Sequence, residues 1–302
     1  MKKSFSQKVL NFGHSLVINN IYPHLSDTRV NQSEFYFLQH RFPDLVHPQT
    51  FTEKLLWIKL HGNLEKYSHL VDKYAVRDYI TKVLGPEYLV PLLGVWDRFD
   101  DIPFDKLPAR FILKATHGSH YIFICKDKSS LDIAKLKKIV NGWLREDFSQ
   151  KFREIQYRDI PPRVIAEQYF EDDTGELTDY KIHCIGGRPQ FIELVQYRNS
   201  HMTDDILDLD WNLLPITCVG YPYSGDKFNT PKPAKLGELL AVAQKLAADF
   251  PLVRVDLYLV GDQIYFGELT FTPGGGFEAF APPSAERHFG DLVDLSRYKS
   301  RL

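Results

Sequence analysis

The spacing of apolar residues predicts helices in the first part of the chain. Thr50 and Glu53 form a capping box ahead of an apolar helical stripe that Gly62 ends. Asp72 is a candidate N-cap for a second helix with its own apolar stripe. Two further helices are predicted over residues 131–145 and 232–250.

Alternation of apolar and polar residues predicts strands in most of the remaining segments. Three hairpins are expected within residues 111–128, 178–197 and 252–276, with turns at His117–His120, Gly186-Gly187 and Gly261-Asp262. Residues 163–173 add a strand that ends in acids. Residues 97–110 are acidic and contain proline, which predicts a surface linker at a subdomain boundary, and residues 198–231 are predicted to be rich in loops.

The last hairpin carries an acid in each arm, Asp256 and Glu268. Strand alternation places Arg254, Asp256 and Tyr258 on one face. A strict two-residue turn pairs Asp256 with Gly267 and sends Glu268 to the other face, whereas a three-residue loop or a bulge at Gly267 brings both acids together. Two adjacent carboxylates need a shared proton or a cation, so the hairpin predicts a hard-cation site. The alternative is a surface hairpin whose acids face water.

Lys114 lies in the middle of an apolar strand, where a buried ammonium group is costly unless it is paired. The turn that follows, His117–His120, contains a glycine. Such a turn can act as a flap whose backbone NH groups cover phosphates. The alternative is an ordinary hairpin whose lysine reaches the surface.

Basic residues also occur at two other places. Lys181 shares a strand face with Asp179 and His183, which indicates either a cross-strand charge pair or the wall of a cleft. Lys73 and Arg77 are four residues apart near a predicted helix start. Two cations beside free helix NH groups suit a phosphate, although a solvated helix face gives the same pattern.

Composition narrows the classes of partner and compartment. The chain has 302 residues and a formal net charge of −2, which gives no general attraction to nucleic acids or membranes, so any anion site must be locally basic. Its three cysteines, Cys125, Cys184 and Cys218, lie in apolar, strand-like runs and predict buried free thiols. Polar residues interrupt the first twenty positions, so we expect no signal peptide, no transmembrane segment and a cytoplasmic protein.

Five motifs occur in a fixed order: DKYAVRDY, FILKATHGSH, VIAEQYF, DYKIHC, and VRVDLY with FGELTFTPGGG. This order resembles the ATP-grasp superfamily, and more narrowly its TupA-like branch, which is associated with teichuronopeptide, capsule and other surface-polysaccharide biosynthesis. The resemblance covers roughly residues 45–295.

The resemblance implies an α+β ATP-grasp fold in which two α+β subdomains with antiparallel sheets clasp ATP. On this basis residues 1–96 are a mainly helical N-terminal region. Residues 97–170 are the flap subdomain, and residues 171–302 are the C-terminal subdomain with the metal-binding hairpin.

The resemblance also implies roles for individual residues. The ATP contacts would be Lys73, Lys114 and Lys181 at the phosphates, the flap of His117, Gly118, Ser119 and His120, and Glu167, Gln168, Tyr169 and Phe170 at the adenine edge. Glu171 or Asp172 would reach the ribose. Mg²⁺ would bind Asp256, Glu268 and Thr270, with Arg254 and Lys181 as catalytic cations. Thr270 stands where many members have asparagine, and His120 where glycine is more usual.

The implied activity is an ATP- and Mg²⁺-dependent carboxylate–amine ligase that acts through an acyl-phosphate. The substrates expected from the resemblance are an amino acid and a uronic-acid-containing saccharide, with room for peripheral association with a polysaccharide assembly complex. Candidate residues for an anionic acceptor are Arg198, His201 and Arg287, and the glycine run 274–276 could bring a carboxylate to backbone NH groups. The alternatives are a glycosyltransferase or sugar kinase of the same pathway, or a catalytically silent nucleotide-binding partner.

Overall fold

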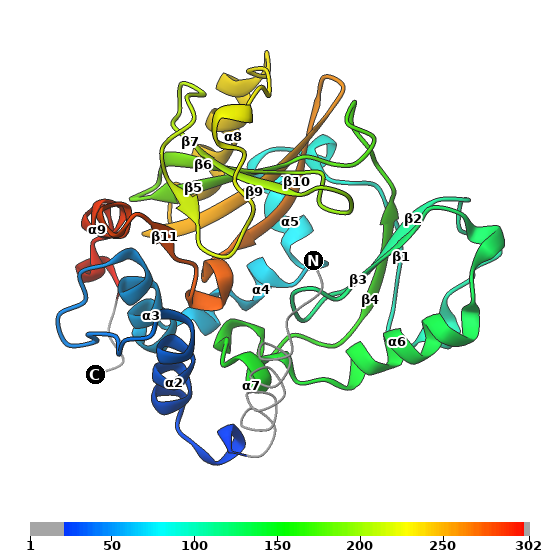
Figure 1. The fold of residues 1–302 in the computed structure, drawn as a ribbon. Helices are drawn as coiled ribbons and strands as arrows, with labels where there is room; N and C mark the ends of the chain where they lie inside the picture. The colour runs from blue at the N-terminus through cyan, green and yellow to red at the C-terminus, as the bar shows by residue number, and fades with distance from the viewer. Residues whose placement is uncertain (1–20, 299–302) are drawn as a thin grey trace, which may run out of the picture.

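Two antiparallel sheets and the helices around them form the protein in this computed structural model, which describes residues 21–298 (Figure 1). The smaller sheet has the strand order β1-β4-β2-β3 and the larger sheet the order β10-β9-β5-β6-β7. Every strand pair within these sheets is antiparallel. The hairpins predicted from period-two alternation all occur.

The smaller sheet consists of β1 (Leu92–Trp96), β2 (Phe111–Ala115), β3 (Ile122–Cys125) and β4 (Val164–Gln168). Helix α6 (Ile133–Arg145) covers one face, where Leu136 and Val140 pack on Phe111 and Leu113. Because successive side chains of a strand point to opposite faces, Lys114 points to the other face. One side of this sheet is therefore a core and the other is free to line a site.

The larger sheet consists of β5 (Asp179–Ile185), β6 (Arg188–Gln196), β7 (Thr203–Leu207), β9 (Leu252–Val260) and β10 (Gln263–Thr270). Helix α8 (Leu236–Ala247) packs on one face through buried residues such as Leu239 and Ala243 (Figure 1). Strand β7 lies within residues 198–231, which we predicted to be loop-rich. The prediction missed it because two acids, Asp204 and Asp205, hide the β pattern although both are buried.

The remaining α-helices of the described residues lie outside the two sheets. They are α2 (Asp27–Gln39), α3 (Phe51–His61), α4 (Ser68–Val71), α5 (Val76–Val83), α7 (Phe148–Phe152) and α9 (Pro283–Leu292). A short sheet pairs β8 (Thr217–Cys218) with β11 (Phe280–Ala281). The predicted capping box of Thr50 and Glu53 opens α3, and Gly62 is its C-cap.

The prediction that Asp72 is the N-cap of the second helix is wrong, because the N-cap of α5 is Ala75. Asp72 accepts hydrogen bonds from the NH groups of Tyr74 and Ala75, at 2.8 and 3.2 Å, in a turn that precedes α5. Helix α5 therefore begins at Val76, and Lys73 lies in the turn. The carboxylate satisfies NH groups ahead of the helix, which sets the direction in which Lys73 leaves the chain.

Other expectations concern the whole chain. The division at residues 96/97 and 170/171 stays a prediction, and β1, which precedes residue 97, pairs with β4 in the smaller sheet. Cys125, Cys184 and Cys218 are buried free thiols, as predicted. Among residues 21–298, no helix combines the length and apolarity that crossing a membrane requires.

Candidate functional site

A cavity of about 490 Å³ lies between the two sheets. The smaller sheet contributes Ile112, Lys114 and Glu167 to its wall. The larger sheet contributes a set of charged residues on neighbouring strands: Asp179, Lys181, Glu193, Arg254, Asp256 and Glu268. Segments far apart in the sequence thus meet in one space.

The register of the large sheet sets four charged residues in one row. Glu268 on β10 pairs with Asp256 on β9, Asp256 pairs with Lys181 on β5, and Lys181 pairs with Glu193 on β6. The hairpin has a two-residue turn, and a register shift between Phe266 and Glu268 places the bulge at Gly267. Of the alternatives left open above, the bulge is correct and the three-residue loop is not.

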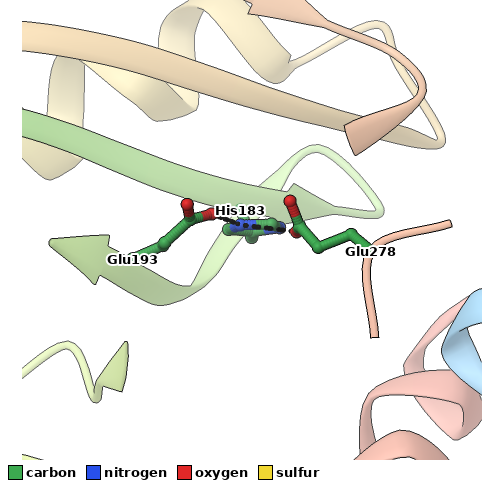
Figure 2. Close-up of side chains that lie close together, drawn as sticks. All are labelled: His183, Glu193 and Glu278. Carbon is green, nitrogen blue, oxygen red and sulfur yellow. Dashed lines mark hydrogen bonds and ion pairs between the residues drawn. The ribbon is translucent and has the colours of Figure 1, made fainter. Parts of the chain in front are cut away.

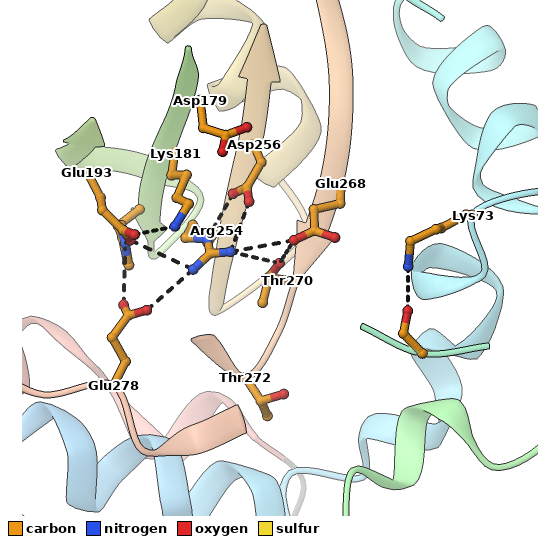
Figure 3. Close-up of polar contacts among 12 residues, drawn as sticks. Lys73, Asp179, Lys181, Glu193, Arg254, Asp256, Glu268, Thr270, Thr272 and Glu278 are labelled. Carbon is orange, nitrogen blue, oxygen red and sulfur yellow. Dashed lines mark hydrogen bonds and ion pairs between the residues drawn. The ribbon is translucent and has the colours of Figure 1, made fainter. Parts of the chain in front are cut away.

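Arg254 lies beside this row, in register with Thr270 and His183, and carboxyl groups surround it (Figure 3). Its Nε is 2.8 Å from Asp256 Oδ1, and its Nη2 is 3.5 Å from Glu268 Oε1. Its Nη1 is 3.3 Å from Glu278 Oε2 and 3.7 Å from Glu193 Oε2. One buried guanidinium therefore faces four carboxyl groups, which it cannot neutralise alone.

The pKa values of the two hairpin acids shift in opposite directions. Burial and the neighbouring Glu268 raise the pKa of Asp256 to about 7, against the opposing effect of Arg254. Burial is the largest single effect on Glu268 and raises its pKa, but several opposing effects, with the charges of Lys73, Arg254 and Lys181 first among them, together hold the pKa below its ordinary value. A divalent cation would relieve the repulsion that Asp256 experiences.

Oxygen ligands for Mg²⁺ are present at this place. Asp256 and Glu268 offer carboxylates, and Thr270 Oγ1 donates a hydrogen bond to Glu268 Oε1 at 3.2 Å. Mg²⁺ prefers one or two carboxylates together with phosphate oxygens, so this donor set fits the ion. When bound, Mg²⁺ would neutralise charge on the phosphates.

Figure 2 shows a second cluster, formed by His183, Glu193 and Glu278, and Arg254 contacts both of its carboxyl groups. His183 Nε2 is 3.0 Å from Glu193 Oε2 and 3.7 Å from Glu278 Oε1. These ligand atoms lie within 4.8 Å of one another, close enough to hold a metal ion. However, Lys181 and Arg254 already place two cations on these carboxylates, which disfavours a third positive charge.

The smaller sheet presents a paired lysine to the cavity. Lys114 Nζ is 2.7 Å from Glu167 Oε2, and Arg77 Nη1 is 3.5 Å from Glu167 Oε1. Lys73 Nζ donates a hydrogen bond to the Gly118 carbonyl at 2.5 Å, and burial lowers the pKa of Lys73. Lys73 therefore ties the turn before α5 to the flap at the edge of the cavity.

The predicted adenine edge and part of the flap also line the cavity. Gln168, Tyr169 and Phe170 follow Glu167 along the wall, beside the apolar side chains of Ile112 and Ile124. Ser119 and His120 line the cavity as well. This end is thus less charged than the Arg254 end.

Several predicted residues lie outside the wall of the cavity. His117 turns to the Trp143 carbonyl, with Nε2 2.9 Å from that oxygen. Glu171 pairs with Arg110, and Asp172 accepts hydrogen bonds within its own turn. His201 stacks on Tyr197, and Arg287 pairs with Asp291 on α9. Gly118 is also outside the wall, but its carbonyl accepts a hydrogen bond from Lys73, which lines the cavity. Arg198, in contrast, lines the cavity and pairs with Asp179.

The sequence analysis missed four acids that the cavity wall contains: Glu154, Glu176, Glu193 and Glu278. Glu193 had a signal, since it is a charge inside the apolar run FIELVQY, the pattern that singled out Lys114. Glu278 lies in a short loop and had none. Its place depends on how the segment after Gly276 packs on the sheet.

This geometry belongs to a known class. Two antiparallel sheets that enclose a cavity, with lysines from several segments facing a hairpin acid pair, are the arrangement of an ATP-grasp protein. The chain belongs to the TupA-like ATP-grasp family: the sequence model described as TupA-like ATPgrasp matches residues 53–294. The predicted α+β ATP-grasp fold and TupA-like branch are therefore confirmed.

The solved structures that match this chain share little sequence with it. The D-alanine–D-alanine ligase of Bacillus anthracis is 15% identical, with a TM-score of 0.41, over 81% of this chain and 69% of the ligase. A RimK domain ATP-grasp protein of Sphaerobacter thermophilus is 12% identical, with a TM-score of 0.41, over 74% and 68%. The ATP-grasp ligase PsnB is 11% identical, with a TM-score of 0.40, over 82% and 66%. Comparison with curated proteins gives no match.

Proposed function

We propose that the protein is an ATP- and Mg²⁺-dependent carboxylate–amine ligase. ATP would phosphorylate a carboxylate, and an amine would attack the acyl-phosphate to give an amide, ADP and phosphate. The observation that carries this proposal is that Lys73, Lys114, Lys181 and Arg254 line the same cavity as the acid pair Asp256 and Glu268. Phosphoryl transfer needs positioning and charge neutralisation, which these residues supply.

Different parts of the cavity wall would bind the phosphates, the adenine and Mg²⁺. Lys73, Lys114 and Lys181 bind phosphates under the flap of residues 117–120, and Glu167 to Phe170 meet the adenine edge. Asp256, Glu268 and Thr270 hold Mg²⁺, and Arg254 stabilises the charge on the transferred phosphoryl group. The reaction would take place in the cytoplasm, where ATP is available.

The proposed substrates are an amino acid and a uronic-acid-containing saccharide of a surface polysaccharide or capsule. Membership of the TupA-like family supports this pathway. A further support is that two exposed aromatic residues, Phe152 and Tyr221, line the cavity. The C–H bonds of a sugar ring pack well on the negative face of an aromatic ring.

The test is ADP release with MgATP, a panel of amino acids and a panel of uronic acids, with hydroxylamine added to trap an acyl-phosphate as a hydroxamate. We expect ADP release that depends on both substrates. Asp256→Asn and Glu268→Gln should each reduce the rate about a hundredfold or more. Glu238→Gln, on the exposed side of α8, is a control that makes the same charge change far from the cavity.

Other outcomes identify the other classes. A phosphorylated sugar without amide or hydroxamate would mean a kinase, and turnover of a nucleotide-sugar without ATP would mean a glycosyltransferase. ATP binding without turnover on any panel would mean a silent nucleotide-binding partner. Each of these results contradicts the ligase proposal.

A further inference from the structure

The end of the cavity near the glycine run is acidic. Glu154 and Glu278 line this end together with Thr272, Gly274 and Gly275, and we call it the acidic end. A Cβ atom on Gly274 would lie 2.8 Å from Glu278 Cβ, and one on Gly275 would lie 3.9 Å from Glu154 Oε2. The turn thus packs between the two acids.

Glu278 is incompletely paired. Its side chain is 6% exposed, and its Oε2 accepts a hydrogen bond from Arg254 Nη1 at 3.3 Å. Its Oε1 lies 3.7 Å from His183 Nε2 and has no hydrogen-bond partner within the described part of the chain. Arg254 is already shared with Asp256, Glu193 and Glu268. A buried carboxyl oxygen without a donor favours a ligand that brings one.

We propose that the acidic end is the subsite for the amine substrate, and that Glu278 binds its ammonium group and then takes its proton. This inference rests on the proposed ligase function. The sequence suggested that the glycine run receives a carboxylate, but two buried acids beside the turn would repel a carboxylate. A primary ammonium group instead supplies three donors and a positive charge.

The proposed step is balanced in atoms and charge. The ammonium group gives one proton to the Glu278 carboxylate, and the free amine attacks the carbonyl carbon of the acyl-phosphate. A C–N bond forms, and the bond between the carbonyl carbon and the oxygen that bridges to phosphorus breaks. The second proton of the nitrogen leaves with the released phosphate. Glu278 then returns its proton to solvent.

The surroundings suit a proton acceptor that works near neutral pH. Burial and the nearby Glu193 raise the pKa of Glu278, and Arg254 opposes them. The charged and titratable groups that face it come from β5, β6, β7, β8, β9 and the loop after β8: Lys181, His183, Glu193, Asp204, Cys218, Arg254 and Tyr221. A base is most effective when its pKa lies near the working pH.

A binding experiment tests the subsite without turnover. Amino-acid amides and their N-acetyl counterparts, which lack the positive charge, are added to the protein with MgADP, and thermal shift is measured. We expect an amide to stabilise the wild type, its N-acetyl form to have no effect, and Glu278→Gln to bind the amide at least tenfold more weakly. Glu238→Gln should behave as the wild type. Failure of every amide to bind, or equal binding by Glu278→Gln, overturns the inference.

A kinetic experiment tests the proton transfer. Hydroxylamine is largely uncharged at neutral pH, so it needs neither an ammonium subsite nor a base. We expect Glu278→Gln to lose about a hundredfold in amide formation and to keep hydroxamate formation, while Glu278→Asp recovers part of the amide rate. Equal losses in both reactions contradict the role of Glu278. Absence of hydroxamate with the wild type contradicts the ligase function itself, and the binding experiment then decides the subsite.

Discussion

Lys59 is a buried cation that holds the glycine turn at the acidic end of the cavity in place. Its Nζ donates a hydrogen bond to the Gly275 carbonyl at 2.7 Å and lies 4.7 Å from the centre of the Phe277 ring. Burial lowers the pKa of Lys59 to about 8, although Glu154 opposes the shift. The lysine therefore fixes the turn of residues 273–276 at a cost in charge burial.

This cost predicts a pH dependence of stability. Below about pH 8 both folded and unfolded states keep the proton of Lys59, and above it the folded state loses the proton first. The unfolded state then binds more protons, so the free energy of unfolding contributed by Lys59 rises with pH. Between about pH 7 and about pH 9, the free energy of unfolding of the wild type should rise by roughly 1 kcal/mol relative to that of Lys59→Met. Urea unfolding of both proteins measures this difference, and a constant difference would contradict the assignment.

The bulge at Gly267 determines what the last hairpin can do. Without it, Glu268 would leave the face that carries Asp256 and Lys181. A Cβ atom on Gly267 would lie 2.9 Å from the Asp256 carbonyl oxygen, so the bulge has no room for a side chain. The sequence indicated that a bulge or a longer loop was needed, but the choice depended on this close backbone approach, which no local pattern contains.

Gly267→Ala should therefore disturb the metal site more than the fold. We expect a loss of roughly 1–3 kcal/mol in stability and a weaker Mg²⁺ response, because Glu268 must shift to relieve the contact. Gly237→Ala is the matched control: it lies in α8, and a Cβ there meets nothing within 4 Å. This control should be neutral or slightly stabilising. Calorimetric unfolding and the Mg²⁺ dependence of ADP release measure both effects, and equal behaviour of the two variants would contradict the role of the bulge.

At the scale of the molecule, the sequence predicted the two sheets better than the site between them. Alternation and capping are local, so hairpins such as residues 178–197 and the start of α3 followed from short segments. The cavity instead depends on how distant elements pack. Lys73 reaches the flap because the turn before α5 lies against it, and Glu278 reaches Arg254 across a loop. Such contacts between separate elements leave no periodic signal in the chain.

The two sheets have separate hydrophobic cores, so a nucleotide bound between them would contact both. Phe111, Leu113 and Val140 belong to the core of the smaller sheet, apart from the core that α8 forms with the larger sheet. A nucleotide held by Lys114 on one side and by Lys181 and Arg254 on the other would couple the two. We therefore expect MgATP to slow amide exchange in β2 and β3 as well as in β9 and β10.

The same coupling should appear in thermal unfolding. At a hundred times its dissociation constant a ligand stabilises the folded state by about 2.7 kcal/mol, so the melting temperature should rise clearly with MgATP. Lys114→Met should lose most of this rise, and the variant should still fold because Glu167 keeps Arg77 at 3.5 Å. Protection confined to the larger sheet, or an unchanged rise in Lys114→Met, would mean that the smaller sheet does not hold the phosphates. The phosphates would then be held without the smaller sheet, and the contact between that sheet and a nucleotide would be limited to the adenine edge at Glu167 to Phe170.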